Sequence, residues 1–225
     1  MTDPPATTTP MSDLFASAVH RFGQVWADLM VAAVAALLVA TAPVVAVHAT
    51  GGAAADAYLV AVFTYAIAYF GVLGWVVLRG LPDRAPRRRV VWTYMTAGLM
   101  GIMAGVLVRG LGTFSVVPLP LLLFAVPAIA AGDVRPAGAL TRSVSLAVRN
   151  FARTWLVWII TVLFSAPVVL AMFLIVDAFT DAGTALLIGL GLSVPIIWPF
   201  SALFVRALYG DLTGRAVVAP QDRTA

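Results

Sequence analysis

The sequence predicts an all-α protein, a polytopic bundle of six transmembrane helices with two amphipathic helices on the cytoplasmic side. Of its 225 residues, 62% are hydrophobic and only 11% are charged, whereas soluble domains carry about 25% charged residues. The mean hydropathy is +1.00, and the apolar residues form long uninterrupted segments. A soluble core cannot bury this much apolar surface, so we expect a membrane protein.

The apolar segments are long enough to cross a hydrocarbon core of about 30 Å, because about 20 helical residues cover that distance. No charged residue falls in their interiors. Backbone groups in lipid need internal hydrogen bonds, which favours helices over open strands. Only Arg109 and Gly110 separate the third segment from the fourth, which predicts a tight hairpin. The predicted spans cover about 29–47, 57–78, 90–108, 111–130, 155–176 and 184–205.

Small residues recur every four positions in the third span, at Ala97, Gly101 and Gly105. Such a stripe allows two helices to approach closely. We expect it to serve packing within the bundle, with contact between two copies of the chain as the alternative.

The arginines predict the orientation of the chain. All fourteen basic residues are arginines. With a cytoplasmic N-terminus, thirteen of them fall on the cytoplasmic side and only Arg109 falls outside, which is the asymmetry of the positive-inside rule. We therefore expect both termini in the cytoplasm, a single membrane domain over 12–210, a disordered tail over 1–11 and a second tail over 211–225. Membrane topology explains the pI of 10.1, so nucleic acid is not an expected partner.

The segment 12–28 precedes the first span and carries apolar side chains at helical spacing. Arg21 and Gln24 lie on the opposite face. The pattern predicts an amphipathic helix that lies in the membrane interface or packs on the bundle. Its apolar face consists of Leu14, Phe15, Ala18, Phe22, Val25, Trp26 and Leu29.

A second amphipathic helix is predicted for 136–154, ahead of the fifth span. Arg142, Arg149 and Arg153 cluster on one side, where they would face phosphate groups if the helix lay in the interface. The same two placements are open for this helix. Its apolar side consists of Leu140, Val144, Ala147, Val148, Phe151 and Trp155.

Arginines of the cytoplasmic side are the candidate functional residues. Near an anionic membrane surface each contributes on the order of 1 kcal/mol of binding free energy. The alternative is that they serve only to fix the topology. We expect contacts with anionic lipid headgroups from Arg87, Arg88, Arg89, Arg142, Arg149 and Arg153.

Residues for catalysis or metal binding are scarce. Cysteine and glutamate are absent, which excludes thiolate chemistry, and His20 and His48 fall on opposite sides of the predicted membrane. Nothing in the spacing selects a pair such as Ser115 with His48. The spans hold no charged residue, which argues against a proton-driven pump. We expect no catalytic residue, no metal and no cofactor.

The two amphipathic segments resemble each other, which suggests an internal repeat. Residues 18–26 match 147–155 at an alanine, a valine, a phenylalanine and a tryptophan. Each segment leads into a span that contains Ala-Pro-Val-Val, at 42–45 and at 166–169. A duplication would make the unit an amphipathic helix followed by a proline-containing hairpin. Chance matches in a chain rich in alanine and valine are the alternative.

Residues 124–155 resemble the membrane-domain family named after glycerophosphoryl diester phosphodiesterases and related bacterial polytopic membrane proteins. The features are Pro127-Ala128-Ile129 at the end of a span, the polar break Gly132-Asp133, and Ala139-Leu140-Thr141-Arg142-Ser143 before a basic helix that carries Phe151. The resemblance implies a bacterial cytoplasmic (inner) membrane protein. It does not imply phosphodiesterase activity, because the chain lacks both that soluble domain and any glutamate.

Taken with the missing catalytic groups, these patterns predict a non-catalytic integral membrane protein that organises lipids or a partner protein at the inner leaflet. Expected partners are membrane lipids with anionic headgroups, and a membrane protein or a second copy of the chain. The alternative function is a transporter or permease subunit, because a repeat of kinked hairpins is common among transporters.

Overall fold

The computed structural model describes residues 9–81, 85–178 and 182–214. Within these ranges 88% of the residues are helical and none forms a strand, which confirms the predicted all-α class. The elements are α1 (Met11–Ala49), α2 (Ala54–Arg79), α3 (Arg87–Leu111), η1 (Gly112–Val116), η2 (Leu119–Leu122), α4 (Ala125–Ala130), η3 (Pro136–Gly138), α5 (Ala139–Arg149), α6 (Phe151–Asp177) and α7 (Ala182–Leu212).

Five helices of the described part are long and apolar enough to cross a membrane. Much of their apolar surface faces outward, and Val31, Val39 and Leu163 are 71%, 73% and 66% exposed. Exposed apolar surface on this scale belongs in lipid rather than in water, as in a multi-pass membrane protein. The apolar stretches are Met11–Val47, Ala55–Arg79, Arg87–Leu111, Phe151–Asp177 and Leu192–Leu212.

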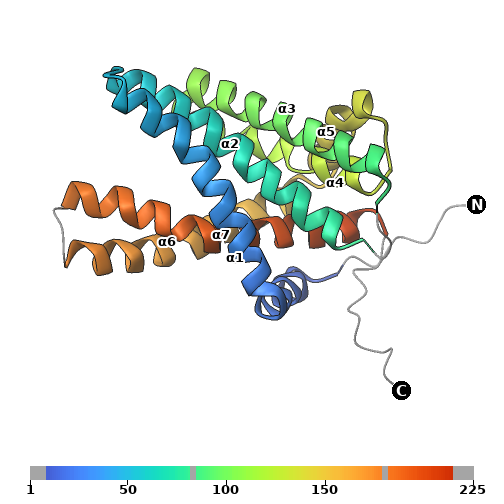
Figure 1. Ribbon diagram of the computed structural model, residues 1–225. Coiled ribbons are helices and arrows are strands. Elements are labelled where there is room, and N and C mark those ends of the chain that lie inside the picture. The colour runs from blue at the N-terminus through green and yellow to red at the C-terminus, as the bar shows by residue number, and fades with distance from the viewer. Residues whose placement is uncertain (1–8, 82–84, 179–181, 215–225) are drawn as a thin grey trace, which may run out of the picture.

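α7 holds the bundle together, because it packs against α1, α2 and α6. α1 and α2 form one antiparallel hairpin, α6 and α7 form a second, and α3 lies along α2. The free ends of the two hairpins lie apart on the left of Figure 1. The buried core includes Phe124, Phe204 and Leu208, near the other end of the bundle.

The small-residue stripe of α3 packs within the bundle, as predicted. A Cβ atom on Gly101 would lie 2.4 Å from the Cα of Ile67, and one on Gly105 would lie 2.6 Å from the ring of Phe63. Ala97 is also buried. The α2 and α3 backbones approach so closely here that larger residues do not fit.

The structure does not confirm the predicted fourth span, 111–130, as a membrane-crossing helix. This segment is divided into η1, η2 and α4, none longer than six residues. Pro118 and Pro120 account for the division, because proline lacks an N–H donor and collides with the preceding turn. The segment nevertheless returns along α3, since Gly132 lies against the guanidinium group of Arg89 in the first turn of α3.

A side chain from α5 satisfies the backbone at this division. Ser143 is fully buried, and its Oγ accepts a hydrogen bond from the Phe124 N–H at 3.0 Å. The same Oγ donates to the Leu121 carbonyl at 2.5 Å. Non-helical backbone at membrane depth is tolerated where protein groups satisfy it. Ser143 therefore closes the break and fixes α5 to the bundle.

α5 packs against α4 and η2, so it lies on the bundle; its placement in the membrane interface, which is compatible with this packing, stays a prediction. The predicted apolar face is only partly buried, because Ala147 is buried whereas Val148 and Phe151 are 58% and 56% exposed. The need to hydrogen-bond the broken backbone turns the Ser143 side inward. The buried side chains are Ala139, Ser143, Leu146 and Ala147.

The first predicted amphipathic helix is the first part of α1, which continues into the span after a non-helical residue, Val25. This part also packs on the bundle. Phe15 lies edge-on to Phe200 of α7, with ring centroids 5.6 Å apart, and Phe22 contacts the same ring. Trp26 of the predicted apolar face is 57% exposed.

The two segments of the suggested repeat enter their hairpins through similar backbone breaks. Val25 has φ −124° and ψ 18°, and Asn150, between α5 and α6, has φ −118° and ψ 38°. The breaks are offset by four residues in the alignment of 18–26 with 147–155. In both segments a helix and a backbone break precede a long hairpin. The duplication stays a hypothesis.

Candidate functional site

Arginines gather at one end of the bundle, where α2 and α7 end and α3 and α6 begin (Figure 1). Contacts there join α6 to α7 through Arg153 and Asp211, and α2 to α7 through Gly80 and Arg206. Arg109 lies in the last turn of α3, at the opposite end. We call this region the basic end; its described arginines are Arg21, Arg79, Arg87, Arg88, Arg89, Arg135, Arg142, Arg149, Arg153 and Arg206.

The aspartates of the basic end are engaged by neighbouring side chains. Asp28 pairs with Arg79, and Asp133 accepts a hydrogen bond from the Tyr209 hydroxyl. The described aspartates of this end are Asp13, Asp28, Asp133 and Asp211. Among the described residues of this end, ten arginines stand against four aspartates, which gives that part of the protein a net positive charge.

Five of the six predicted headgroup residues are at least partly accessible. Arg87, Arg88 and Arg149 are exposed, and Arg89 and Arg142 are half-buried. Arg87, Arg88 and Arg89 occupy the first turn of α3, which contains no acidic residue. Cations are unfavourable near the positive end of a helix dipole. Their placement therefore weakens α3 slightly unless anions lie beside them.

The sixth predicted residue, Arg153, is engaged within the protein. Its Nη1 lies 2.7 Å from Asp211 Oδ2, and its Nη2 donates to the Thr9 carbonyl at 2.8 Å. Asp211 also accepts hydrogen bonds from the Thr9 backbone N–H, at 3.1 Å, and hydroxyl. The Arg153 and Asp211 side chains are only 19% and 8% exposed. Arg153 thus ties the chain before α1 to α6 and α7 and is not a surface group.

Two further arginines hold the end of α2, and the sequence reasoning did not single them out. Arg79 lies 5.0 Å from the centroid of the Trp75 ring, a cation–π geometry. Arg206 of α7 donates from Nη2 to the Gly80 carbonyl at 2.7 Å. A signal was available, because each is the residue directly after a predicted span, where arginines reach toward the interface.

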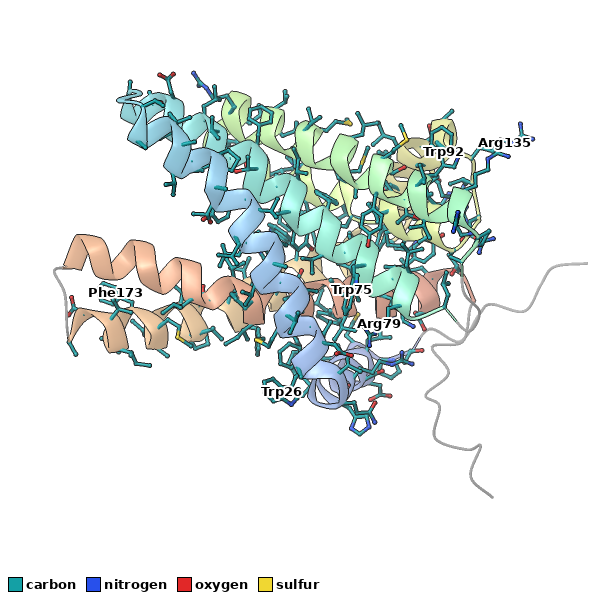
Figure 2. All side chains as sticks on the ribbon, in the orientation of Figure 1. Trp26, Trp75, Arg79, Trp92, Arg135 and Phe173 are labelled. Atoms are coloured by element: carbon teal, nitrogen blue, oxygen red, sulfur yellow. The ribbon has the colours of Figure 1, made fainter. Side chains whose placement is uncertain are left out.

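Tryptophans accompany the arginines at this end. Trp75 precedes Arg79 by one helical turn and Trp92 lies in the second turn of α3, and Figure 2 labels both together with the exposed Trp26. Tryptophan is enriched at the level of the lipid headgroups. Their position is that of an interfacial belt next to the basic end.

Hydroxyl groups form a second cluster, midway along the helices. The Tyr69 hydroxyl lies 2.9 Å from the Ser201 Oγ, and the Tyr65 hydroxyl lies 3.1 Å from the Thr41 Oγ1. Trp198 packs edge-on against both tyrosine rings. The cluster joins α1 and α2 to α7 and is half-buried, apart from the buried Ser201.

Metal ligands do not come together in the part of the chain that the structure describes, where no group of three histidine or aspartate side chains is placed to hold an ion. Ser115 is buried in η1. The side chain of His48, its conceivable partner, lies outside the described residues.

Fold and site together define a class, a multi-pass helical membrane protein with an arginine-rich end. No protein-family model matches the chain, and neither a curated protein nor a solved structure does. The resemblance of residues 124–155 to the phosphodiesterase-associated membrane-domain family therefore stays a prediction.

Proposed function

We propose that this chain is a non-catalytic protein of the bacterial inner membrane, with cytoplasmic termini, whose basic end binds anionic lipid headgroups and so organises the inner leaflet. The observation that carries the proposal is the charge arrangement at the basic end. Three of its described aspartates, Asp28, Asp133 and Asp211, have partners inside the protein, while the exposed arginines of this end are Arg87, Arg88 and Arg149.

Two physical points support this function. An anion beside the first turn of α3 would complement both the arginines and the free N–H groups of the helix start. The tryptophan belt would set the depth at which the arginines meet phosphate groups. With about 1 kcal/mol from each arginine near the surface, three exposed arginines enrich anionic lipid noticeably.

The test replaces Arg87, Arg88 and Arg149 together by glutamine. We expect the variant to co-purify with a lower ratio of phosphatidylglycerol to phosphatidylethanolamine than the wild type, as measured by lipid mass spectrometry after extraction in a mild detergent. Arg109→Gln is the control, because Arg109 lies at the opposite end of α3. An unchanged ratio in the triple variant contradicts the proposed function.

Transport is the second candidate, and the hydroxyl cluster favours it. Thr41, Tyr65 and Tyr69 of the first hairpin are half-buried, and the Tyr69 hydroxyl contacts Ser201 of the second hairpin. The free ends of the two hairpins diverge (Figure 1). Single cysteines in place of Thr41 and Tyr65, a half-buried pair of the cluster, test it. Reaction with a water-soluble maleimide in intact membranes would indicate an aqueous path, and protection of both would exclude one there.

A further inference from the structure

The first part of α1 lies across α7 and is separated from the span that follows by a break in the helix. Val25 has non-helical backbone angles, and the residues before it are turned away from the direction of the span (Figure 1). A few residues at the end of a regular element are a common form of hinge. We call residues 9–24 the strap, because they run over one side of α7, and Val25 connects them to the rest of α1.

The strap covers an aromatic surface made by α6 and α7. The Phe15 ring of the strap lies edge-on to Phe200 and Phe204, with ring centroids 5.6 and 5.9 Å apart. Phe200 in turn stacks on Phe164 of α6 at 4.1 Å, and Phe22 of the strap also contacts the Phe200 ring. Phe200 and Phe204 are fully buried. Without the strap, part of this aromatic surface would be open to a hydrocarbon chain.

The start of the strap covers a buried ion pair. Arg153 and Asp211 lie 2.7 Å apart, and their side chains are only 19% and 8% exposed. Thr9 donates to Asp211 from its backbone N–H and its hydroxyl, and its carbonyl accepts from Arg153. Polar groups at such burial are costly without hydrogen-bond partners. If the strap leaves, the carboxylate therefore needs a new donor and the guanidinium needs a new acceptor.

Thr9 presents donors and an acceptor side by side, and this pattern indicates the chemistry that can replace it. The pair of Arg153 and Asp211 has no net charge, so the carboxylate would repel a purely anionic headgroup. A phosphoethanolamine headgroup instead carries both parts, an ammonium group with three N–H donors and phosphate oxygens that accept hydrogen bonds. A zwitterion is thus the chemical complement of the ion pair that Thr9 contacts.

We propose that the strap is an autoinhibitory lid over a site for phosphatidylethanolamine, whose ammonium group binds Asp211 and whose phosphate group binds Arg153. An acyl chain of the lipid takes the place of the strap against the aromatic surface. The strap and the lipid compete for the same side chains, so binding requires the strap to lift about Val25. The site goes beyond the proposed function, because it selects a zwitterionic headgroup and uses none of the exposed arginines.

Two spin labels measure the position of the strap, since the chain has no cysteine of its own. Ala16→Cys on the strap and Ala137→Cys in η3 are both at exposed positions, and electron–electron double resonance on the full chain in nanodiscs gives the distance between the labels. We expect one distance in phosphatidylcholine, whose ammonium group has no N–H donor, and a second distance when phosphatidylethanolamine is added. Phosphatidylglycerol, which carries no cation, should not produce the second distance.

A release variant, Thr9→Val with Phe15→Ala, removes contacts of the strap and leaves every residue of the site in place. It should raise the population at the second distance about tenfold in phosphatidylethanolamine, the scale of one charge-assisted hydrogen bond. Ser12→Ala with Val19→Ala is the matched control, because both side chains are exposed on the strap, and it should behave as the wild type. Equal populations in the release and control variants overturn the proposal.

The lipid series decides the nature of the site in the otherwise unchanged protein. An equal response to phosphatidylglycerol and phosphatidylethanolamine overturns the zwitterionic site, and an equal response to water-soluble phosphoethanolamine overturns its assignment to a lipid. Replacing Arg87, Arg88 and Arg149 by glutamine should change the enrichment of phosphatidylglycerol but not the distance between the labels. The site under the strap and the proposed function can therefore fail independently of each other.

Discussion

The hydroxyl of Ser143 hydrogen-bonds two backbone groups, the Phe124 N–H and the Leu121 carbonyl, near the point where Pro118 and Pro120 divide the helix. We expect Ser143→Ala to lower the free energy of unfolding by about 1–2 kcal/mol, because it leaves the Phe124 N–H and the Leu121 carbonyl buried without this partner. Thermal unfolding followed by tryptophan fluorescence measures the change. Ser145→Ala, on the same helix, is the control; equal melting temperatures for the two variants would contradict the role of Ser143.

The two ion pairs of the basic end differ in how deeply their side chains are buried. Asp211→Asn leaves Arg153 unpaired with 19% of its side chain exposed, and we expect a loss of about 1–3 kcal/mol. Asp28→Asn breaks a pair whose side chains are 51% and 56% exposed, so its effect should stay below about 1 kcal/mol. Chemical denaturation measures the free energy of unfolding of the two single variants. A double variant with Arg153→Gln should be less destabilised than the sum of the single changes.

Sequence reasoning found the arginines of the basic end but not their partners. Arg153 and Asp211 are separated by 58 residues in the chain, and no local pattern indicates that they pair. Arg206 lies directly after a predicted span, but its contact with Gly80 depends on how α7 crosses α2. Charge and hydropathy predict which end a side chain reaches, and only packing decides whether it is engaged there.

Helix α3 provides a matched pair of glycines for testing its packing on α2. Gly101→Ala should destabilise the bundle by about 1–3 kcal/mol, because the new Cβ meets the backbone at Ile67. Gly98 has open space around it, so Gly98→Ala should be neutral or stabilising by up to about 1 kcal/mol. Melting temperatures in detergent distinguish them. A larger loss at Gly98 would mean that the stripe is not the packing face.

Among the elements, the sequence predicted the apolar segments well and their continuity less well. Predicted span 155–176 lies within α6 and 57–78 lies within α2, because length and apolarity determine such helices. Segment 111–130 is as apolar as the others, but its prolines decide its shape. The predicted apolar face of α5 is only partly buried, because the hydrogen bonds of Ser143 orient that helix together with its apolar contacts.

For the molecule as a whole, the proposed orientation has a direct test, because the chain contains no cysteine. Cysteine at Ala137, near the basic end, should react with an impermeant maleimide only after spheroplasts are opened. Cysteine at Phe114, 77% exposed in η1, should react in intact spheroplasts. Labelling of both from the same side would show that segment 111–130 does not return across the membrane.

Partners are best sought with the intact molecule. We expect affinity purification from native membranes to yield anionic lipid without a stoichiometric protein, as direct lipid binding at the basic end predicts. Mass spectrometry of proteins and lipids from the same sample is the measurement. A stoichiometric protein partner would instead make the chain a subunit or scaffold, and light scattering would reveal a second copy.

The bridge made by Ser143 also imposes an order on biosynthesis. Ser143 leaves the ribosome about 20 residues after the backbone that it completes, so the segment around Leu121 and Phe124 enters the membrane machinery before its hydrogen-bond partner exists. An unsatisfied break is costly in lipid. We therefore expect the segment 119–130 to reach its final packing only after α5 has been synthesised.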